Sequence, residues 1–163
     1  MIVLDLCCGD GYFTGPIARI VDGNVYGVDL DPILIDRARV ELERNATSVL
    51  GMICADARTL EHILPGKVDF VLIANTFHGV PDKTELARAA AALRPAGTLA
   101  IVNWQPLPRE HTVVLGEPRG PKTEMRMSPD DVGRILEPAG FMLEKVIDLA
   151  PYHYAAVYRM PLD

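Results

Sequence analysis

Short apolar segments recur along the chain, each bounded by turn-forming residues. Runs of this length are typical of strands that are buried on both faces of a sheet. Segments with a longer, helix-like period lie between the earlier runs. The pattern predicts seven strands: the first begins at Ile2 and leads into the loop at Cys7, and the others lie at Asn24–Asp29, around Val49–Cys54, and at Val68–Ala74, Thr98–Asn103, Phe141–Leu149 and Tyr152–Arg159.

Three helices carry recognisable start signals. Asp31 followed by Pro32 gives an N-cap with proline at the first helical position. Asp82 begins a variant of the capping box that Glu85 completes, and Ser128 precedes another proline. Proline and glycine then stop the second and third helices. The predicted helices span Asp31–Arg44, Asp82–Leu93 and Ser128–Ala139.

The alternation of strands and helices predicts an α/β fold. Successive βαβ units imply parallel strands with right-handed crossovers. The connection between Phe141–Leu149 and Tyr152–Arg159 contains Pro151 and is too short for a helix, so the last strand must be antiparallel. We expect a three-layer, Rossmann-like sandwich around a mostly parallel sheet, with residues 1–163 forming a single domain.

The loop after the first strand carries the most informative chemistry. Asp5 lies in the strand, and Gly9 and Gly11 follow in the turn. A dinucleotide fingerprint would need a third glycine where Thr14 stands, and the Gly-Lys-Ser/Thr triplet of a phosphate-binding loop is absent. Asp5 and Asp10 would repel a pyrophosphate. The charge pattern instead favours a cationic nucleoside without phosphate, such as S-adenosylmethionine.

These residues resemble those of the class I (Rossmann-like) S-adenosylmethionine-dependent methyltransferases. The similarity is greatest to the small-molecule branch that includes quinone-biosynthesis and arsenite methyltransferases, and it covers nearly the whole chain. The family's first loop usually reads Asp-x-Gly-x-Gly-x-Gly, and Cys7 here replaces the first glycine. The resemblance implies a seven-stranded sheet in the order 3-2-1-4-5-7-6, with the last strand antiparallel.

The resemblance also implies a set of cofactor contacts at the strand ends. Asp29 would accept both ribose hydroxyls, Asp56 the adenine amino group, and the Ala57 amide would meet the adenine ring. Asn75 follows the fourth strand. The implied cofactor-binding residues are Asp5, Gly9, Gly11, Asp29, Leu30, Asp56, Ala57 and Asn75. We expect no metal, because Cys7, Cys8 and Cys54 lack four-ligand zinc spacing.

His78 is the candidate catalytic residue. The segment from Asn75 to Asp82 is similar to the family's fourth motif, in which one or two histidines follow Asn or Asp, and Gly79 stands at the second position. The family's reaction is an in-line displacement in which positioning supplies most of the catalysis. His78 could take a proton from a hydroxyl or an acidic carbon. A packed loop histidine bonded to the backbone remains the alternative.

The segment Gln105–Met127 is too long for an ordinary connection in a compact domain. It follows the fifth strand, where family members commonly place acceptor-recognition elements. A surface loop packed by its own apolar side chains is the alternative. Candidates to line an acceptor pocket are Trp104, His111, Met125 and Met127, and those to receive an anionic acceptor group are Arg109, Arg119, Lys122 and Arg126.

Composition narrows the choice of partner. The chain has 163 residues, 49% hydrophobic, and a net charge of -6, which disfavours a nucleic-acid substrate and favours a small-molecule acceptor. No apolar run is long enough for a membrane span and no basic leader precedes Asp5, so we expect a cytoplasmic protein with reduced cysteines.

Relatives normally carry several dozen residues before the first strand, which form helices over the cofactor, whereas this chain enters the strand at Ile2. We therefore expect an open pocket. Met1 could be an internal start, a second subunit could supply the cover, or the bare domain could bind its acceptor differently. A homodimer is one possible arrangement. The alternative function is a non-catalytic S-adenosylmethionine-binding subunit that needs a partner chain; a nicotinamide dehydrogenase ranks third.

Overall fold

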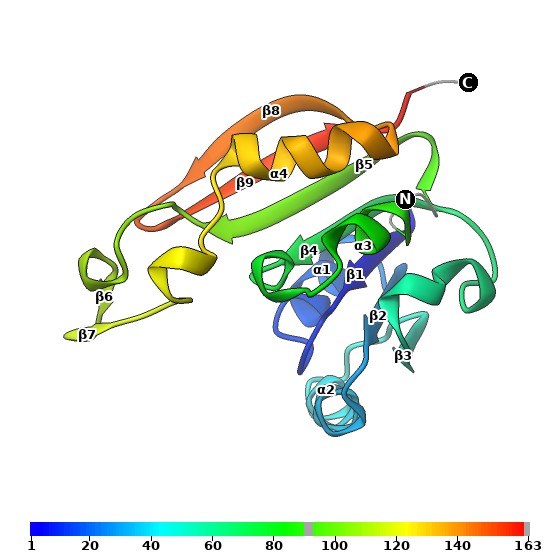
Figure 1. Ribbon diagram of the computed structural model, residues 1–163. Coiled ribbons are helices and arrows are strands. Elements are labelled where there is room, and N and C mark those ends of the chain that lie inside the picture. The colour runs from blue at the N-terminus through cyan, green and yellow to red at the C-terminus, as the bar shows by residue number, and fades with distance from the viewer. Residues whose placement is uncertain (90–92, 162–163) are drawn as a thin grey trace.

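The computed structural model describes residues 1–89 and 93–161, and its main feature is a seven-stranded sheet (Figure 1). The spatial order is β3-β2-β1-β4-β5-β9-β8, which is the predicted 3-2-1-4-5-7-6. Neighbours from β3 to β5 pair in parallel, and β9 is antiparallel to both β5 and β8. The strands are β1 Val3–Leu6, β2 Val25–Asp29, β3 Gly51–Cys54, β4 Val68–Ala74, β5 Leu93–Trp104, β8 Met142–Leu149 and β9 His153–Arg159.

Helices cover both faces of this sheet. In Figure 1, α3 and α4 lie on the viewer's side, across β4 and across β5 and β9, while α1 lies behind β1. The α-helices are α1 Thr14–Ile20, α2 Pro32–Arg44, α3 Lys83–Ala89 and α4 Pro129–Leu136. The shorter 3₁₀ segments are η1 Ala57–His62, η2 Phe77–Gly79, η4 Arg109–His111, η5 Thr123–Met125 and η6 Glu137–Ala139.

The predicted start signals act as expected. The Asp31 carboxylate accepts hydrogen bonds from the Ile33 and Leu34 amides, and Asp82 accepts one from the Glu85 amide. Ser128 and Asp131 form a reciprocal capping box at the start of α4. These side chains satisfy amides that have no partner inside their own helix.

The predicted extent of the second helix is wrong at its end. Leu93 is the first residue of β5 and pairs with Val68, so the helix cannot reach it; residues 90–92 lie outside the described part. Leu93 is fully buried in the main core, and Pro95 disfavours helical backbone in the residue before it. Core packing and proline together therefore extend the strand toward its N-terminal side.

Three apolar clusters hold the layers together. The largest packs the sheet against α3 and α4 and includes Leu4, Ile73 and Tyr158. A second joins α2 to β3, and a third joins α1 to β1 and β2. Strand β8 closes one edge of the sheet with every residue exposed, including five large apolar side chains. Of the helices that the structure describes, none has the length and apolar character needed to cross a bilayer.

The capping box gives a direct test of this local structure. Ser128→Ala removes the oxygen that accepts the Asp131 amide proton at 3.1 Å, and we expect it to lower the free energy of unfolding by about 1 kcal/mol in urea denaturation. Ser48→Ala, at an exposed serine outside any helix, is the control and should leave the stability unchanged. Equal stabilities for the two variants would contradict the assignment.

Candidate cofactor and acceptor site

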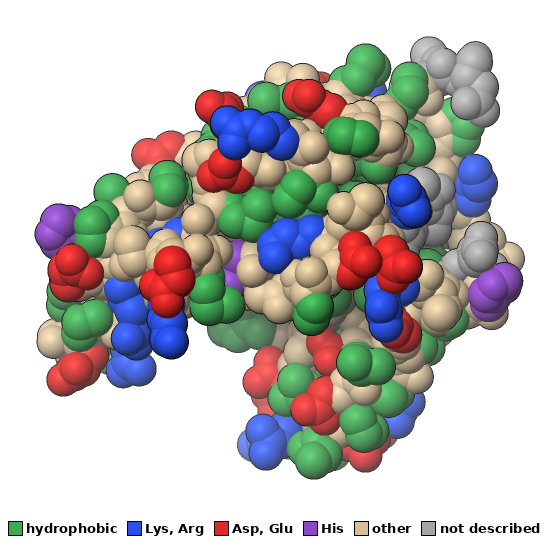
Figure 2. All heavy atoms as spheres, in the orientation of Figure 1, with side chains coloured by type: hydrophobic (Ala, Val, Ile, Leu, Met, Phe, Trp, Pro, Cys, Tyr) green, Lys and Arg blue, Asp and Glu red, His purple; other side chains and the backbone are tan. Residues whose placement is uncertain are grey.

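The candidate site lies where the carboxyl ends of β1, β2, β3 and β4 meet. Strand β1 has β2 on one side and β4 on the other, so the strand order reverses at β1. Ligands of open α/β sheets bind at such a switch point. Figure 2 shows the surface hollowed beside this edge, between the lobe that carries α2 and the segment that carries β6 and β7. The topology thus brings the predicted strand-end residues to one hollow.

The loop after β1 has an unusual backbone. Cys7, Gly9 and Gly11 all have positive φ, at 59°, 57° and 82°. Glycine adopts this conformation without steric cost, whereas a residue with a side chain does so with strain on the order of 1–3 kcal/mol. The conformation explains why the resembling family usually has glycine at the position of Cys7.

The two glycines are needed for different reasons. A side-chain carbon built on Gly9 would meet nothing within 4 Å, so Gly9 faces open space that a ligand can enter. At Gly11 the same carbon would lie 3.0 Å from the Ala38 side chain in α2. Gly9 therefore leaves room for a ligand, and Gly11 lets the loop pack against α2.

Asp29 fixes this loop to the end of β2. Its carboxylate accepts the Gly9 amide proton at 2.8 Å and the Asp31 amide proton at 3.0 Å. Each carboxylate oxygen retains lone pairs that can accept further hydrogen bonds. Leu30, the next residue, is 69% exposed and lies at the same rim. The structure therefore places both predicted residues at the carboxyl end of β2.

Asp5 lies beneath the loop rather than at its surface. It is only 2% exposed, and its carboxylate accepts a hydrogen bond of 2.6 Å from the Thr14 hydroxyl. Burial raises the pKa of Asp5 to about 6, although the Thr14 hydrogen bond opposes the shift. Asp5 therefore supports the loop from below, and any effect that it has on a ligand would come through its charge and through that loop.

The acidic residues act together on the loop. Burial, followed by the charges of Asp29, Asp5 and Asp56 in that order, raises the pKa of the Cys7 thiol to about 12. Burial and the charges of Asp5 and Asp29 also raise the pKa of Cys8. A negative potential that disfavours a thiolate stabilises a cation at the same place.

Asp56 is at the site but already has a partner. Arg58 donates to both carboxylate oxygens, with a closest distance of 2.6 Å, and lowers the pKa of Asp56 to about 2. Arg58 also pairs with Glu85 of α3. An adenine amino group would have to share Asp56 with Arg58. Ala57 begins η1, and Asn75 follows β4 in the left-handed conformation with its amide bonded to Val102.

His78 lies in η2, at the end of β4 and against β5. Its Nδ1 atom is buried without a hydrogen-bond partner. Burial lowers the pKa of His78 below the ordinary 6.5; Asn103 opposes that shift, and Lys83 and Arg126 add to it. The ring is therefore neutral at pH 7, as a base requires. Our sequence reasoning missed Asn103, whose signal is a single amide within the apolar run of β5.

The segment Gln105–Met127, here called the arm, has an internal framework. It contains η4, η5 and a short hairpin formed by β6 Val113–Val114 and β7 Glu117–Pro118. Arg126 is 8% exposed and donates to three arm carbonyls and the Thr112 hydroxyl, with its guanidinium 5.4 Å from the centre of the Trp104 ring. Its carbonyl partners are Gln105, Arg119 and Pro121.

The four basic residues of the arm that we predicted as anion contacts divide into two groups. Arg126 and Arg109 donate to carbonyls of the arm itself, and those that Arg109 binds belong to Pro118 and Gly120. They therefore hold the arm together. Arg119 and Lys122 are exposed, so an anionic acceptor group could reach them. Of the apolar candidates, Met127 packs against the main core, Met125 is 40% exposed, and the exposed His111 ends η4.

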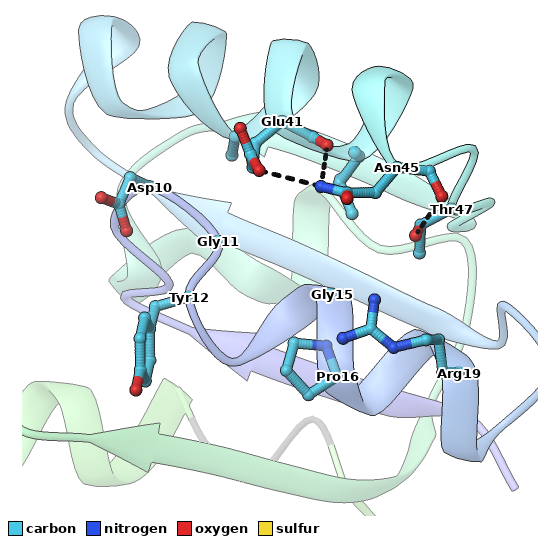
Figure 3. Close-up of a pocket in the computed structure, with 11 residues that line it drawn as sticks. Asp10, Gly11, Tyr12, Gly15, Pro16, Arg19, Glu41, Asn45 and Thr47 are labelled. Carbon is cyan, nitrogen blue, oxygen red and sulfur yellow. Dashed lines mark hydrogen bonds between the residues drawn. The ribbon is translucent and has the colours of Figure 1, made fainter.

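A second hollow, of about 290 Å³, lies between α1 and α2 (Figure 3). The Asn45 amide on its wall donates to the Glu41 carbonyl and carboxylate, each at 2.8 Å. This groove shares only Gly11 with the predicted cofactor contacts. It is lined by Asp10, Gly11, Tyr12, Gly15, Pro16, Arg19, Ala38, Glu41, Leu42, Asn45 and Thr47.

Comparison with known proteins identifies the family. A family described as "Methyltransferase domain" matches residues 3–97, which include β1 to β4 and the loops between them. The chain belongs to this methyltransferase domain family. The resemblance seen in the first loop is thereby confirmed, and the matched residues contain every predicted contact of the candidate cofactor site.

Curated relatives are longer than this methyltransferase domain. The ribosomal protein L11 methyltransferase of Dechloromonas aromatica is 36% identical over 61% of this chain and 31% of its own length. The trans-aconitate 2-methyltransferase of Methylobacterium radiotolerans is 32% identical over 86% of this chain and 54% of its own. The ubiquinone biosynthesis O-methyltransferase of Neisseria meningitidis serogroup C is 26% identical over 85% of this chain and 62% of its own length. The chain therefore spans less than two thirds of each of these relatives.

Solved structures share the fold. A S-adenosylmethionine-dependent methyltransferase from Aquifex aeolicus has a TM-score of 0.83 at 23% identity, covering 98% of this chain and 82% of that one. The magnesium protoporphyrin IX methyltransferase of Synechocystis, solved with bound S-adenosylmethionine, has a TM-score of 0.68 at 18% identity, with coverages of 98% and 70%. The Rossmann-like fold that we expected from the sequence is confirmed.

Burial of Asp5 gives a pH-dependent prediction. The pKa of Asp5 is 3.8 ordinarily and about 6 in the folded protein, so the folded state binds more protons than the unfolded state between these values. The Asp5 carboxylate therefore destabilises the domain progressively as the pH rises through that window. Relative to wild type, Asp5→Asn should gain on the order of 2–3 kcal/mol of stability between about pH 4 and pH 7.

Urea denaturation across that pH range measures the difference. Asp10→Asn removes an exposed carboxylate from the same loop and serves as the control, whose stability should follow that of wild type at every pH. Parallel pH curves for Asp5→Asn and wild type would show that Asp5 ionises as it does in the unfolded chain.

Proposed function

We propose that this methyltransferase domain transfers a methyl group from S-adenosylmethionine to a small-molecule acceptor. The observation that carries the proposal is the convergence of Asp29, Asp5 and Asp56 on the loop at Cys7, beside the open space at Gly9. A cation without phosphate gains from that potential, whereas a pyrophosphate would be repelled. The bound cofactor supplies an electrophilic methyl group on a sulfonium.

The residues present suit this cofactor. Asp29 has its carboxylate fixed by two amides and can accept from the vicinal hydroxyls of a ribose. Gly9 leaves the space above the loop free of side-chain atoms. Ala57 presents an amide that has no acceptor within η1, because it begins that helix. Asp56 can reach the adenine amino group only by sharing its oxygens with Arg58.

The acceptor class, the cellular compartment and a possible dimer are proposed from different observations. Two of the relatives are named for trans-aconitate and for ubiquinone biosynthesis, and the net charge of -6 suits a small molecule better than a nucleic acid. Cys7, Cys8 and Cys54 are all free thiols, which fits a reducing cytoplasm. A second copy of the chain could cover the exposed apolar side chains of β8.

Catalysis would rest mainly on positioning. Holding an acceptor atom in line with the methyl group can supply about 7–11 kcal/mol in ideal intramolecular cases. For a hydroxyl or an acidic carbon, the neutral ring of His78 is the group able to take the proton. Asn75 and η2 follow the carboxyl end of β4, so the His78 ring lies at the same edge of the sheet as the loop that follows the carboxyl end of β1.

Incubation with methyl-labelled S-adenosylmethionine and a panel of metabolites, with and without cell extract, tests the proposal. With the pure protein alone, the label should pass from S-adenosylmethionine to a small molecule. Transfer that appears only with extract protein would favour the alternative of a cofactor-binding subunit that needs a partner. Cofactor binding without transfer under either condition would contradict methyl transfer to the acceptors tested.

Asp29 provides the test of cofactor binding. Asp29→Asn keeps the shape of the side chain but removes its charge, and hydrogen bonds to a charged group contribute about 1.5–3 kcal/mol. We expect S-adenosylmethionine to bind at least about tenfold more weakly in calorimetry. Asp36→Asn, on the exposed surface of α2, should bind as wild type does. Unchanged affinity in Asp29→Asn would remove Asp29 from the site.

His78 provides the test of acid–base chemistry. With a hydroxyl or acidic-carbon acceptor, His78→Ala should lower turnover by about 10²-fold or more, since general bases contribute about 10²–10⁴-fold. The affinity for S-adenosylmethionine should stay within about twofold of wild type. Because the pKa of His78 is lowered, wild-type turnover should be flat at neutral pH and fall only below pH 6.5.

The control for that variant is His62→Ala, at an exposed histidine of η1. Its turnover and pH profile should match those of wild type. If His78→Ala turned over at the wild-type rate, the ring would be a packed loop residue with no part in the reaction.

A further inference from the structure

Two buried polar atoms without partners belong to η2 and β5, which pack against each other. Asn103 of β5 is 1% exposed, and its Oδ1 atom has no hydrogen-bond partner. The Nδ1 atom of His78 in η2 is likewise buried and unpartnered. Segment η2 packs against β5, and Asn103 raises the pKa of His78 against the effect of burial. Nearly all buried polar groups in folded proteins are paired, so two such atoms together point to a functional arrangement.

A chain of hydrogen bonds sets the orientation of the Asn103 amide. The Tyr154 hydroxyl donates its single proton to the Met127 carbonyl at 2.8 Å. Tyr154 can therefore only accept from Asn103, whose Nδ2 atom lies 3.4 Å from the hydroxyl oxygen. The NH₂ group of the amide faces Tyr154, which leaves Oδ1 for His78.

We propose that Asn103 is a positioning residue, whose Oδ1 accepts the Nδ1–H proton of His78 and so fixes the ring tautomer. A neutral imidazole has one N–H and one lone pair. With the proton on Nδ1, the lone pair is on Nε2, which is not among the buried atoms that lack a partner in the described part of the chain. The role of that lone pair as a base rests on the function proposed above.

The arrangement defines where the proton goes. When an acceptor hydroxyl gives its proton to Nε2, its O–H bond breaks, an Nε2–H bond forms, and the electron pair stays on the acceptor oxygen. The ring becomes an imidazolium whose Nδ1–H still points at Oδ1 of Asn103. Because an amide carries no charge, Asn103 can orient the ring without favouring the imidazolium before the acceptor's proton arrives. The charges of Lys83 and Arg126 lower the pKa of His78 and so also favour the neutral ring.

The same chain of hydrogen bonds connects the arm to the base. Met127, which accepts from Tyr154, is the last residue of the arm. A change in the position of this carbonyl would therefore reach His78 through Tyr154 and Asn103. This gives two variants that alter the tautomer without touching the ring, Asn103→Leu and Tyr154→Phe.

Nuclear magnetic resonance of the full chain with ¹⁵N-labelled histidine tests the proposal. Long-range ¹H–¹⁵N correlation distinguishes the two tautomers, and the His78 signals are assigned by their loss in His78→Gln. In wild type, His78 should carry its proton on Nδ1. In Asn103→Leu the Nε2–H tautomer, which the ring of a solvated histidine side chain favours, should predominate.

The tyrosine variants form a matched pair. Tyr154→Phe should give a mixture of tautomers, because the Asn103 amide loses the acceptor that orients it. Tyr158→Phe removes another buried hydroxyl from the same face of β9, 3.5 Å from the Pro129 carbonyl, and should retain the wild-type tautomer. This pair, together with wild type, decides the question even if Asn103→Leu does not fold.

A third variant tests the contact by charge. Asn103→Asp places a carboxylate against Nδ1 and should raise the pH at which His78 titrates. An Nε2–H tautomer in wild type, or a tautomer unchanged in both Asn103→Leu and Tyr154→Phe, would overturn the proposal. These readouts need neither cofactor nor acceptor, so a failure of methyl transfer would refute the proposed function without deciding the tautomer.

Discussion

The hydrogen bond from the Gly9 amide to the Asp29 carboxylate, 2.8 Å long, is the contact on which the site depends. The loop after β1 has three left-handed residues, one of them Cys7, and such a backbone persists only where its surroundings hold it. Asp29 holds the loop from the end of β2, and Asp5 with Thr14 holds it from below. The same carboxylates that shape the loop make it attractive to a cation.

Stability and function oppose each other at Asp5. The carboxyl group is buried, and its raised pKa shows that its charge is disfavoured there. A protein selected for stability alone would place an uncharged side chain at this position. Placing the acid beneath the loop strengthens the negative potential that Cys7 experiences. We interpret this as stability given up in exchange for cofactor affinity.

Much of the fold could be predicted because local and global signals agree. Apolar runs gave the seven strands, Asp31 and Ser128 marked helix starts, and the first loop indicated the family. The end of the second helix was missed because Leu93 belongs to the core of the sheet, a contact distant in sequence. The partners of Asp56 and Arg126 were missed because a side chain's choice of partner depends on its rotamer and on the fold of the loop around it, which the residue order does not give.

The central claim is that the loop at Gly9, Asp29 and Asp5 receives a positively charged, phosphate-free nucleoside. A crystal structure with sinefungin, a stable cationic analogue of S-adenosylmethionine, measures this most directly. We predict the ribose at Asp29 and the ligand's ammonium group above Gly9, with the loop unchanged. A crevice closed by the protein's own side chains, or a ligand found only in the groove between α1 and α2, would contradict the account.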